Sequence, residues 1–163
     1  MTLSVKYRRN SPVIHSGGQT GVDRAALDFA LCHNISCSGW CAPGRMAEDG
    51  PINLRYPLRP VYGSNNDLRT ELNVVDCDAT LIICFDEMDR GTNITIEMTS
   101  IHNKPLFVWK LDSADASAEV RKIKKWLNKY QVKHLNIAGP RESNARGIYE
   151  RTLESLQMLL LED

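Results

Sequence analysis

Two glycine-rich turns, one near each end of the 163-residue chain, constrain its fold most strongly. The first spans residues 16–21, with the sequence SGGQTG, and the second spans residues 138–143, with the sequence AGPRES. Each follows a short apolar run and precedes a helical pattern, so each is expected to join a strand to a helix. Such turns direct unpaired backbone N–H groups toward the positive end of a helix dipole, where they can bind an anion. If both turns lie on the same edge of one sheet, they converge on a phosphorylated ligand.

Hydrophobic periodicity predicts five strands that alternate with helices along the chain. The expected strands cover residues 13–15, 35–40, 79–85, 105–109 and 134–138. The expected helices begin near residues 22, 67, 91, 118 and 148, and the third of them turns Ile94, Met98 and Ile101 inward. Residues 79–85 are apolar and rich in β-branched side chains, which is typical of a parallel strand covered on both faces.

This order of elements predicts an α/β fold, a Rossmann-like three-layer sandwich with a mainly parallel sheet, formed by residues 1–163 as a single domain. The ligand crevice of such a sheet lies at the carboxyl ends of its strands, where the glycine-rich turns fall. Residues 41–64 contain many Pro and Gly residues, which predicts an ordered functional loop rather than a long helix or strand. We expect this loop to cover a bound ligand.

Composition limits the partners and the compartment of the protein. Lys and Arg together number 20, as do Asp and Glu, so no net charge favours binding to nucleic acid. Because no run of about 18 apolar residues is present, no membrane span is expected. Five cysteines, an odd number, in a chain without a secretory h-region favour free thiols and a cytoplasmic protein. Cys37 and Cys41 have no second ligand pair at suitable spacing, so no metal site is predicted.

Arginines and other polar residues beside the turns extend the candidate site. Residues 16–21 match neither the dinucleotide nor the P-loop signature, although their glycines still allow a phosphate to approach the backbone. A planar guanidinium suits oxoanions, but each arginine taken alone fits a surface charge, and the first turn fits a purely structural connection equally well. The predicted ligand-binding residues are Gly17, Gly18, Gln19, Thr20, Gly21, Arg45, Arg69, Gly91, Thr92, Asn93, Glu97, Gly139, Arg141 and Ser143, and no catalytic residue is assigned.

Six separated motifs carry a resemblance to a known family. They are residues 16–27 (SGGQTGVDRAAL), 39–45 (GWCAPGR), 47–50 (AEDG), 55–58 (RYPL), 69–74 (RTELNV) and 136–143 (NIAGPRES). In this order, from about residue 12 to residue 160, the chain resembles the circularly permuted YpsA-like branch of the SLOG superfamily, a group that includes molybdenum-cofactor carrier proteins. The resemblance implies a Rossmann-like fold, a homodimer or homotetramer, and a pocket for the molybdenum cofactor or a related phosphorylated ligand. It further implies molybdoenzymes as acceptors of that cofactor.

The chain is also similar to the LOG-type, lysine decarboxylase-like proteins, relative to which it is circularly permuted. Their N-terminal phosphate turn resembles residues 137–143, and their Gly-Gly-x-Gly-Thr-x-x-Glu turn resembles residues 90–97. Thr70 replaces a lysine and Arg90 replaces a glycine of these proteins, so only part of the phosphoribohydrolase machinery is present. Three functions are therefore considered: a non-catalytic cofactor carrier, a hydrolase of nucleoside 5′-monophosphates that uses Arg69 and Glu97, and a sensor of a nucleotide-derived ligand.

Overall fold

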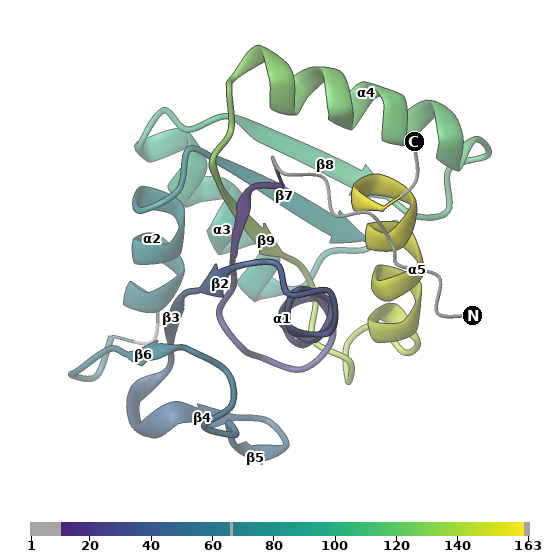
Figure 1. The fold of residues 1–163 in the computed structure, drawn as a ribbon. Helices are drawn as coiled ribbons and strands as arrows, with labels where there is room; N and C mark the ends of the chain where they lie inside the picture. The colour runs from purple at the N-terminus through teal and green to yellow at the C-terminus, as the bar shows by residue number, and fades with distance from the viewer. Residues whose placement is uncertain (1–10, 66, 162–163) are drawn as a thin grey trace.

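A five-stranded parallel sheet forms the centre of the computed structural model, which describes residues 11–65 and 67–161 (Figure 1). The strands of this sheet are β1 (Val13–His15), β2 (Cys37–Ser38), β7 (Ala79–Cys84), β8 (Leu106–Lys110) and β9 (His134–Ala138). The helices are α1 (Val22–Cys32), α2 (Leu68–Val75), α3 (Arg90–Ile101), α4 (Ala116–Lys129) and α5 (Ile148–Leu160). Strands and helices alternate as predicted, and the α/β fold with its parallel sheet is confirmed.

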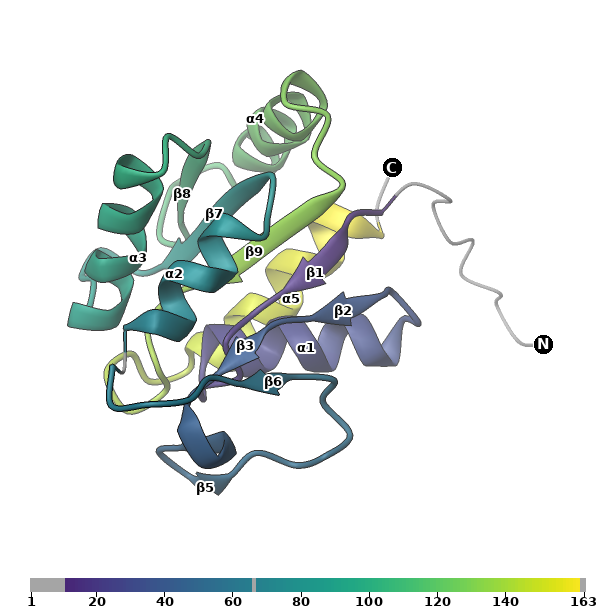
Figure 2. The same ribbon diagram turned by 90° about the vertical axis from the view of Figure 1, so that its left-hand side faces the viewer.

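Helices cover both faces of the sheet. Helices α1, α4 and α5 lie on one face, with α1 and α5 side by side, and α2 and α3 lie on the other (Figures 1 and 2). This arrangement follows from right-handed crossovers, because a connection that moves in the opposite direction across a parallel sheet places its helix on the opposite face. The result is the three-layer sandwich that the sequence predicts.

The spatial order of the strands displays the circular permutation directly. The order across the sheet is β2-β1-β9-β7-β8. If β9 is counted as the first strand, and β1, β2, β7 and β8 follow it, the order becomes 3-2-1-4-5, that of the Rossmann fold. The last strand of this chain thus occupies the position of the first strand of a Rossmann sheet. The topological switch point, where such sheets bind ligands, lies between β9 and β7.

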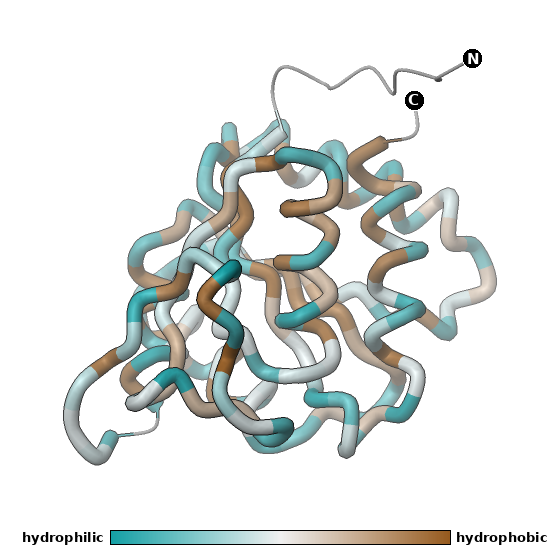
Figure 3. The backbone as a smooth tube through the Cα atoms, turned by 60° about the horizontal axis from the view of Figure 1, so that its bottom comes forward, coloured by the Kyte–Doolittle hydropathy of each residue, from teal (hydrophilic) through white to brown (hydrophobic). Residues whose placement is uncertain are grey.

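The core lies between the sheet and its helices, and all six residues of β7 are buried. Hydrophobic and hydrophilic residues alternate along the helices in Figure 3, so that one side of each helix faces the sheet. The largest fully buried side chains include Ile14, Leu81, Trp109, Ile123, Ile137 and Leu156. A second, smaller cluster holds the segment 41–64 against α1, and its buried members are Leu27, Cys41, Ile52, Tyr56 and Leu58.

Segment 41–64 is ordered through several short elements instead of one long one. It contains the end of β3 (Trp40–Cys41), a 3-10 turn (Pro43–Arg45), β4 (Met46–Ala47), β5 (Gly50–Pro51) and β6 (Arg59–Pro60). β4 and β5 pair as an antiparallel hairpin, and β6 pairs in parallel with β3. The predicted ordered loop is therefore present, and we refer to residues 41–64 as the cover loop.

The strand predicted over residues 35–40 is wrong as a single strand. It divides at Gly39 into β2, which pairs with β1, and β3, which pairs with β6. Gly39 has φ +148, and a Cβ there would lie 2.0 Å from the carbonyl oxygen of Ser16. The backbone of the first glycine-rich turn therefore lies directly against Gly39, and the strand bends away at this point.

The inward face predicted for α3 is also wrong. Thr92, Thr95 and Thr99 are its buried residues, whereas Ile101 is 57% exposed. Threonine tolerates burial here because its hydroxyl can bond within the helix: Thr95 donates to the carbonyl of Gly91 (3.1 Å) and Thr99 to that of Ile96 (2.7 Å). A count of apolar residues at helical spacing does not detect such a face.

Replacement of Thr152 by valine should stabilise the protein. Thr152 in α5 is fully buried, and its hydroxyl has no hydrogen-bond partner among the residues that the structure describes. An unsatisfied buried hydroxyl costs about 1–3 kcal/mol, so Thr152→Val should raise the free energy of unfolding by about 1 kcal/mol in urea titrations. Ser155→Ala is the control, because the Ser155 hydroxyl donates to the carbonyl of Arg151 at 2.7 Å. A Thr152→Val protein as destabilised as Ser155→Ala would show that the hydroxyl is satisfied in solution.

Candidate functional site

The two glycine-rich turns lie against each other at the carboxyl ends of β1 and β9. The amide of Val22 donates to the carbonyl of Pro140 (3.3 Å), and the amide of Glu142 donates to the hydroxyl of Thr20 (3.2 Å). A Cβ on Gly21 would lie 2.4 Å from the Pro140 carbonyl oxygen. The end of β7 meets them too, because a Cβ on Gly139 would lie 2.1 Å from the carbonyl oxygen of Ile83. The expectation that both turns share one edge of the sheet is confirmed.

A cavity of about 50 Å³ opens where these turns meet the switch point between β9 and β7. It is lined by Gly17, Gln19, Asp23, Arg69, Thr70, Asn73, Asp89, Gly91, Thr95, Asn136, Ala138, Gly139 and Arg141. A site for one water needs roughly 10–15 Å³ on this scale, so the cavity has room for a few waters or one tetrahedral oxoanion. A larger hollow of about 620 Å³ lies at the other end of the strands, beside α4 and α5, and none of the turn residues lines it.

An ion pair of Arg69 with Asp23 crosses the first turn within this cavity. Arg69 extends from α2, and its Nη1 lies 3.9 Å from Oδ2 of Asp23 in the first turn of α1. The pair passes directly over Gly17, where a Cβ would lie 2.2 Å from Arg69 Nη1 and 2.9 Å from Asp23 Oδ2. A side chain at Gly17 would therefore displace the ends of Arg69 and Asp23. Asp23 is 6% exposed, and burial raises its pKa to about 6 although Arg69 and the amide of Gln19 favour the ionised form.

Asp89 joins the start of α3 to the second glycine-rich turn, residues 138–143, which we call the closing turn. Its Oδ1 caps α3 by accepting from the amide (2.9 Å) and hydroxyl (2.7 Å) of Thr92. Its Oδ2 accepts from the amide of Arg141 (3.3 Å) and the side chain of Asn144 (3.0 Å). Burial alone would raise the pKa of Asp89, but the bonds from Asn144, Thr92 and Arg141 outweigh it and lower the pKa. The carboxylate of Asp89 thus accepts the hydrogen bond of the Thr92 amide in the first turn of α3.

Asn73 connects the cavity to the start of the cover loop. This buried residue of α2 accepts from the amide of Trp40 (2.8 Å) and donates to the carbonyl of the same residue (2.9 Å). The side chain pairs with the backbone of β3 as a neighbouring strand would. Sequence reasoning did not select Asp23, Asp89 or Asn73. A capping pattern, Asp89 three residues before Thr92, was the one local signal for any of them.

The predicted binding residues divide into groups in the structure. Gly17, Gln19, Arg69, Gly91, Gly139 and Arg141 line the cavity. Gly18 faces the cover loop, since a Cβ there would lie 2.5 Å from the side chain of Leu58. Thr92 is bonded to Asp89, and Asn93 is exposed at the surface of α3. Thr20 and Ser143 do not line the cavity, and both contact Glu48.

Arg45 is committed to the cover loop. Its guanidinium donates to the carbonyls of Ile52 (3.5 Å), Asn53 (3.0 Å), Tyr56 (3.0 Å) and Leu58 (2.6 Å). Arg45 is not among the residues that line the cavity. The side chain is surrounded by carbonyl oxygens that hold it in place, so the structure assigns it to shaping the loop.

Glu97 is exposed on α3 and does not line the cavity. In a Gly-Thr-x-x-Glu motif the glutamate stands three residues after the threonine, and that position after Thr92 is Thr95. Thr95 does line the cavity. Because successive helix residues turn by about 100°, Glu97 points roughly 200° away from Thr95. Glu97 therefore lies on a different side of α3 from the cavity that Thr95 lines.

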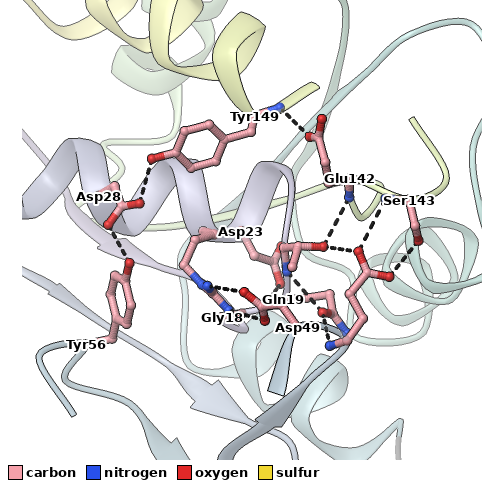
Figure 4. Close-up of polar contacts among 12 residues, drawn as sticks. Gly18, Gln19, Asp23, Asp28, Asp49, Tyr56, Glu142, Ser143 and Tyr149 are labelled. Carbon is pink, nitrogen blue, oxygen red and sulfur yellow. Dashed lines mark hydrogen bonds and ion pairs between the residues drawn. The ribbon is translucent and has the colours of Figure 1, made fainter. Parts of the chain in front are cut away.

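The cover loop is fastened to both turns by acidic residues at the tip of its hairpin. Glu48 accepts from the hydroxyl of Thr20 and from the amide (3.3 Å) and hydroxyl (2.6 Å) of Ser143. Asp49 accepts two bonds from Arg24, at 3.0 and 3.2 Å (Figure 4). Arg141 Nη1 lies 3.7 Å from Glu48. The hairpin tip, with Thr20 and Ser143, lines an open hollow of about 700 Å³.

A second set of bonds anchors the loop to α1 and α5. Asp28 accepts from the hydroxyls of Tyr56 (2.6 Å) and Tyr149 (2.7 Å) and from Arg55 (2.9 Å), as Figure 4 shows for the two tyrosines. Tyr56 is buried in the small hydrophobic cluster of the loop. The base of the loop is therefore held independently of the tip.

Glu48→Gln should loosen the hairpin tip. Burial acts to raise the pKa of Glu48, but the hydroxyls of Ser143 and Thr20 outweigh it and lower the pKa, so the ionised form makes these bonds. Loss of the charge should weaken the attachment by roughly 1 kcal/mol and speed protease cleavage within residues 41–64 about fivefold. Glu154→Gln, which removes an exposed partner of Arg151, is the matched control. Equal cleavage rates in the two variants would contradict a fastening role for Glu48.

The described residues contain no group of three or more His, Cys, Asp or Glu side chains that can hold a metal ion. Cys37 is half-buried, Cys41 is buried, and burial raises the pKa of both thiols. Within the same part of the chain, no helix has the length and apolar character needed to cross a membrane.

A parallel sheet of order 3-2-1-4-5, with glycine-rich turns at the carboxyl ends of its strands, defines a protein of the Rossmann-like fold class. Residues 14–160 match the model of the circularly permuted YpsA SLOG family, and the chain belongs to that family. The resemblance inferred from the six motifs is thereby confirmed.

A solved structure is similar to almost the whole chain. It is a crystal structure named "Putative molybdenum carrier protein" from Syntrophus aciditrophicus SB, with 38% sequence identity and a TM-score of 0.89. The match covers 93% of this chain and 96% of the other. A comparison with curated proteins gave no match.

Proposed function

We propose that this protein binds the molybdenum cofactor through its terminal phosphate and carries it without transforming it. One observation supports this above all: the two glycine-rich turns meet at the switch point around an oxoanion-sized cavity that Arg69 and Arg141 line. A protein 38% identical is named a molybdenum carrier, which favours this ligand over other phosphorylated molecules.

The residues present suit the parts of this ligand. Gly17 and Gly139 line the cavity, and the guanidiniums of Arg69 and Arg141 would supply charge-assisted hydrogen bonds to the phosphate. Ligand pockets are usually about 300–1,000 Å³, so the cavity admits only the anionic end. The flat pterin would lie outside it, and the hollow of about 700 Å³ that Glu48 and Ser143 line is large enough for it. Oxo-molybdenum needs no thiolate from the protein, and no cysteine lines the cavity.

The resemblance to the family adds expectations about partners. We propose a homodimer or homotetramer in the cytoplasm that passes the cofactor to molybdoenzymes. A sensor of a nucleotide-derived ligand would use the same cavity, so identification of the bound molecule distinguishes it from a carrier. Hydrolysis of nucleoside 5′-monophosphates is not favoured, because Glu97 points away from the cavity.

The test of this function is the content of protein purified with its ligand. We expect pterin fluorescence, molybdenum and phosphorus in about equal molar amounts, released together on denaturation. Incubation with AMP followed by assay for free adenine is the second arm. Adenine release that depends on Arg69, or purification with a nucleotide in place of a pterin, would overturn the carrier function.

Arg141→Ala should weaken a phosphorylated ligand without disturbing the fold. The Arg141 side chain is 41% exposed, and its guanidinium lies 3.7 Å from Glu48. Loss of a charged hydrogen bond costs roughly 1.5–3 kcal/mol, so the dissociation constant should rise about ten- to 150-fold. Arg121→Ala on the exposed side of α4 is the control. An unchanged dissociation constant in Arg141→Ala would remove this residue from the site.

A further inference from the structure

A carboxylate within an anion-binding cavity is unexpected, and Asp23 is such a carboxylate. It lines the cavity, is 6% exposed, and accepts from the amide of Gln19 at 3.4 Å. Its partner Arg69 is 3.9 Å away, beyond hydrogen-bond distance. Asp23 therefore keeps acceptor capacity within the cavity that the ion pair does not use.

The charges that face Asp23 come from every element around the cavity. Arg69 of α2 and Arg141 of the closing turn are positive, whereas Asp89, which precedes α3, is negative like Asp23 itself. The four charges cancel. A phosphate monoester dianion would therefore add two negative charges to a neutral set in a small, partly desolvated space, where unscreened repulsion is strong. One proton between ligand and carboxylate relieves part of that repulsion.

We infer that Asp23 is a specificity-determining residue that shares one proton with the bound oxoanion, so that the site selects phosphate monoesters over sulfate esters. This inference rests on the proposed function, since it concerns the same cavity. A phosphate monoester monoanion carries the proton and donates it from its P–OH group to a carboxylate oxygen of Asp23. The dianion carries none, so its complex takes up one proton from solvent. A sulfate ester has no proton to donate at neutral pH, and its oxygens accept one poorly.

The acidity of the two partners is matched. Burial raises the pKa of Asp23 to about 6, and the second pKa of a phosphate monoester is also about 6. Above this pH both partners are ionised before they meet, so binding requires uptake of one proton. The affinity should then fall about tenfold for each pH unit between pH 7 and 9. Below pH 6 both free partners hold protons, so affinity should be highest near pH 6.

The test compares phenyl phosphate with phenyl sulfate, two probes of matched shape, by calorimetry of the full chain at pH 8. Measurements in two buffers of different ionisation enthalpy count the protons taken up. For the wild-type protein we expect the uptake of one proton for each phenyl phosphate bound. We also expect an affinity for phenyl phosphate ten- to hundredfold above that for phenyl sulfate, which is the difference that one charge-assisted hydrogen bond makes. In Asp23→Asn the proton uptake should vanish and the two affinities should become similar. Asp112→Asn, an exposed carboxylate after β8, is the matched control.

The outcomes separate this inference from the proposed function. Phenyl phosphate binding without proton uptake, or with equal affinity for phenyl sulfate, would overturn the role of Asp23 and leave the anion site in place. Absence of binding by either probe would overturn both. If Asp23→Asn does not fold, the proton count and the pH profile of the wild-type protein still test whether a proton is shared in the complex.

Discussion

Gly21→Ala should lower the free energy of unfolding by roughly 3 kcal/mol, which combines backbone strain with overpacking. Gly21 has φ 79 and ψ −129, a conformation that only glycine adopts readily. A Cβ there would lie 2.4 Å from the carbonyl oxygen of Pro140 and 2.8 Å from the amide nitrogen of Glu142, so the added methyl group pushes the two turns apart. Thermal unfolding should show a melting temperature lower by about 6–12 °C. The same separation should abolish binding of a phosphate ester.

Gly50→Ala separates backbone strain from the clash between turns. Gly50 also has a positive φ, of +107, but a Cβ there would meet no atom within 4 Å. Its replacement should cost about 1 kcal/mol of backbone strain and leave ligand binding intact. If Gly21→Ala destabilised the protein no more than Gly50→Ala, close contact of the two turns would not contribute to stability.

Asp23→Asn should stabilise the protein at neutral pH, by up to about 3 kcal/mol. The folded-state pKa of Asp23, about 6, lies above the ordinary 3.8, so the folded protein holds this proton more tightly than the unfolded chain. The resulting stability is present below pH 3.8 and is lost as the pH rises through 6. Above pH 6 the wild-type protein holds a charged, buried carboxylate, and the amide of the variant avoids that cost.

The comparison is made by urea unfolding at pH 4 and pH 8. Wild-type and Asp23→Asn proteins should have similar stability at pH 4, and the variant should be the more stable at pH 8. Asp112→Asn should match the wild-type protein at both values, because its carboxylate is exposed. A variant less stable at pH 8 than at pH 4, relative to wild type, would show that Arg69 more than compensates the burial of Asp23. A variant that gains stability but loses the preference for phosphate esters would mark Asp23 as a residue retained for function.

Elements that depend on local pattern could be predicted from the sequence. β9 covers residues 134–138, as predicted, and its three central residues are all buried. The fully buried β7 was found within one residue, since a strand covered on both faces is apolar throughout. The convergence of the two turns followed from the same logic, because carboxyl ends of parallel strands share one edge.

Features that depend on contacts between distant segments could not be predicted. The break at Gly39 arises from the backbone of Ser16, and nothing in residues 35–40 indicates it. Asp89 bonds to amides of a turn about fifty residues away. Such carboxylates resemble surface charges in a sequence, and only the fold brings them to the amides that they occupy.

Arg45 and Glu97 show the converse error, because the sequence selects both as binding residues and neither lines the cavity. Both residue types suit the proposed chemistry, but the guanidinium of Arg45 is held by carbonyls of the cover loop, and Glu97 lies on the wrong side of α3. Residue type and nearby motifs select candidates, whereas direction of the side chain decides which of them line a cavity. Glu97 lies two residues beyond Thr95, which lines the cavity, and two residues turn a helical side chain by roughly 200°.

The most direct test of a shared anion site is a titration of ¹⁵N-labelled protein with phenyl phosphate, followed by the backbone amide resonances. The amides of Gly17 and Gly18 in the first turn and of Gly139 and Arg141 in the closing turn should shift together along one binding curve. The amide of Gly63, at the far end of the cover loop, should stay unchanged. Shifts confined to one turn, or different dissociation constants for the two turns, would contradict a single ligand held between the two ends of the chain.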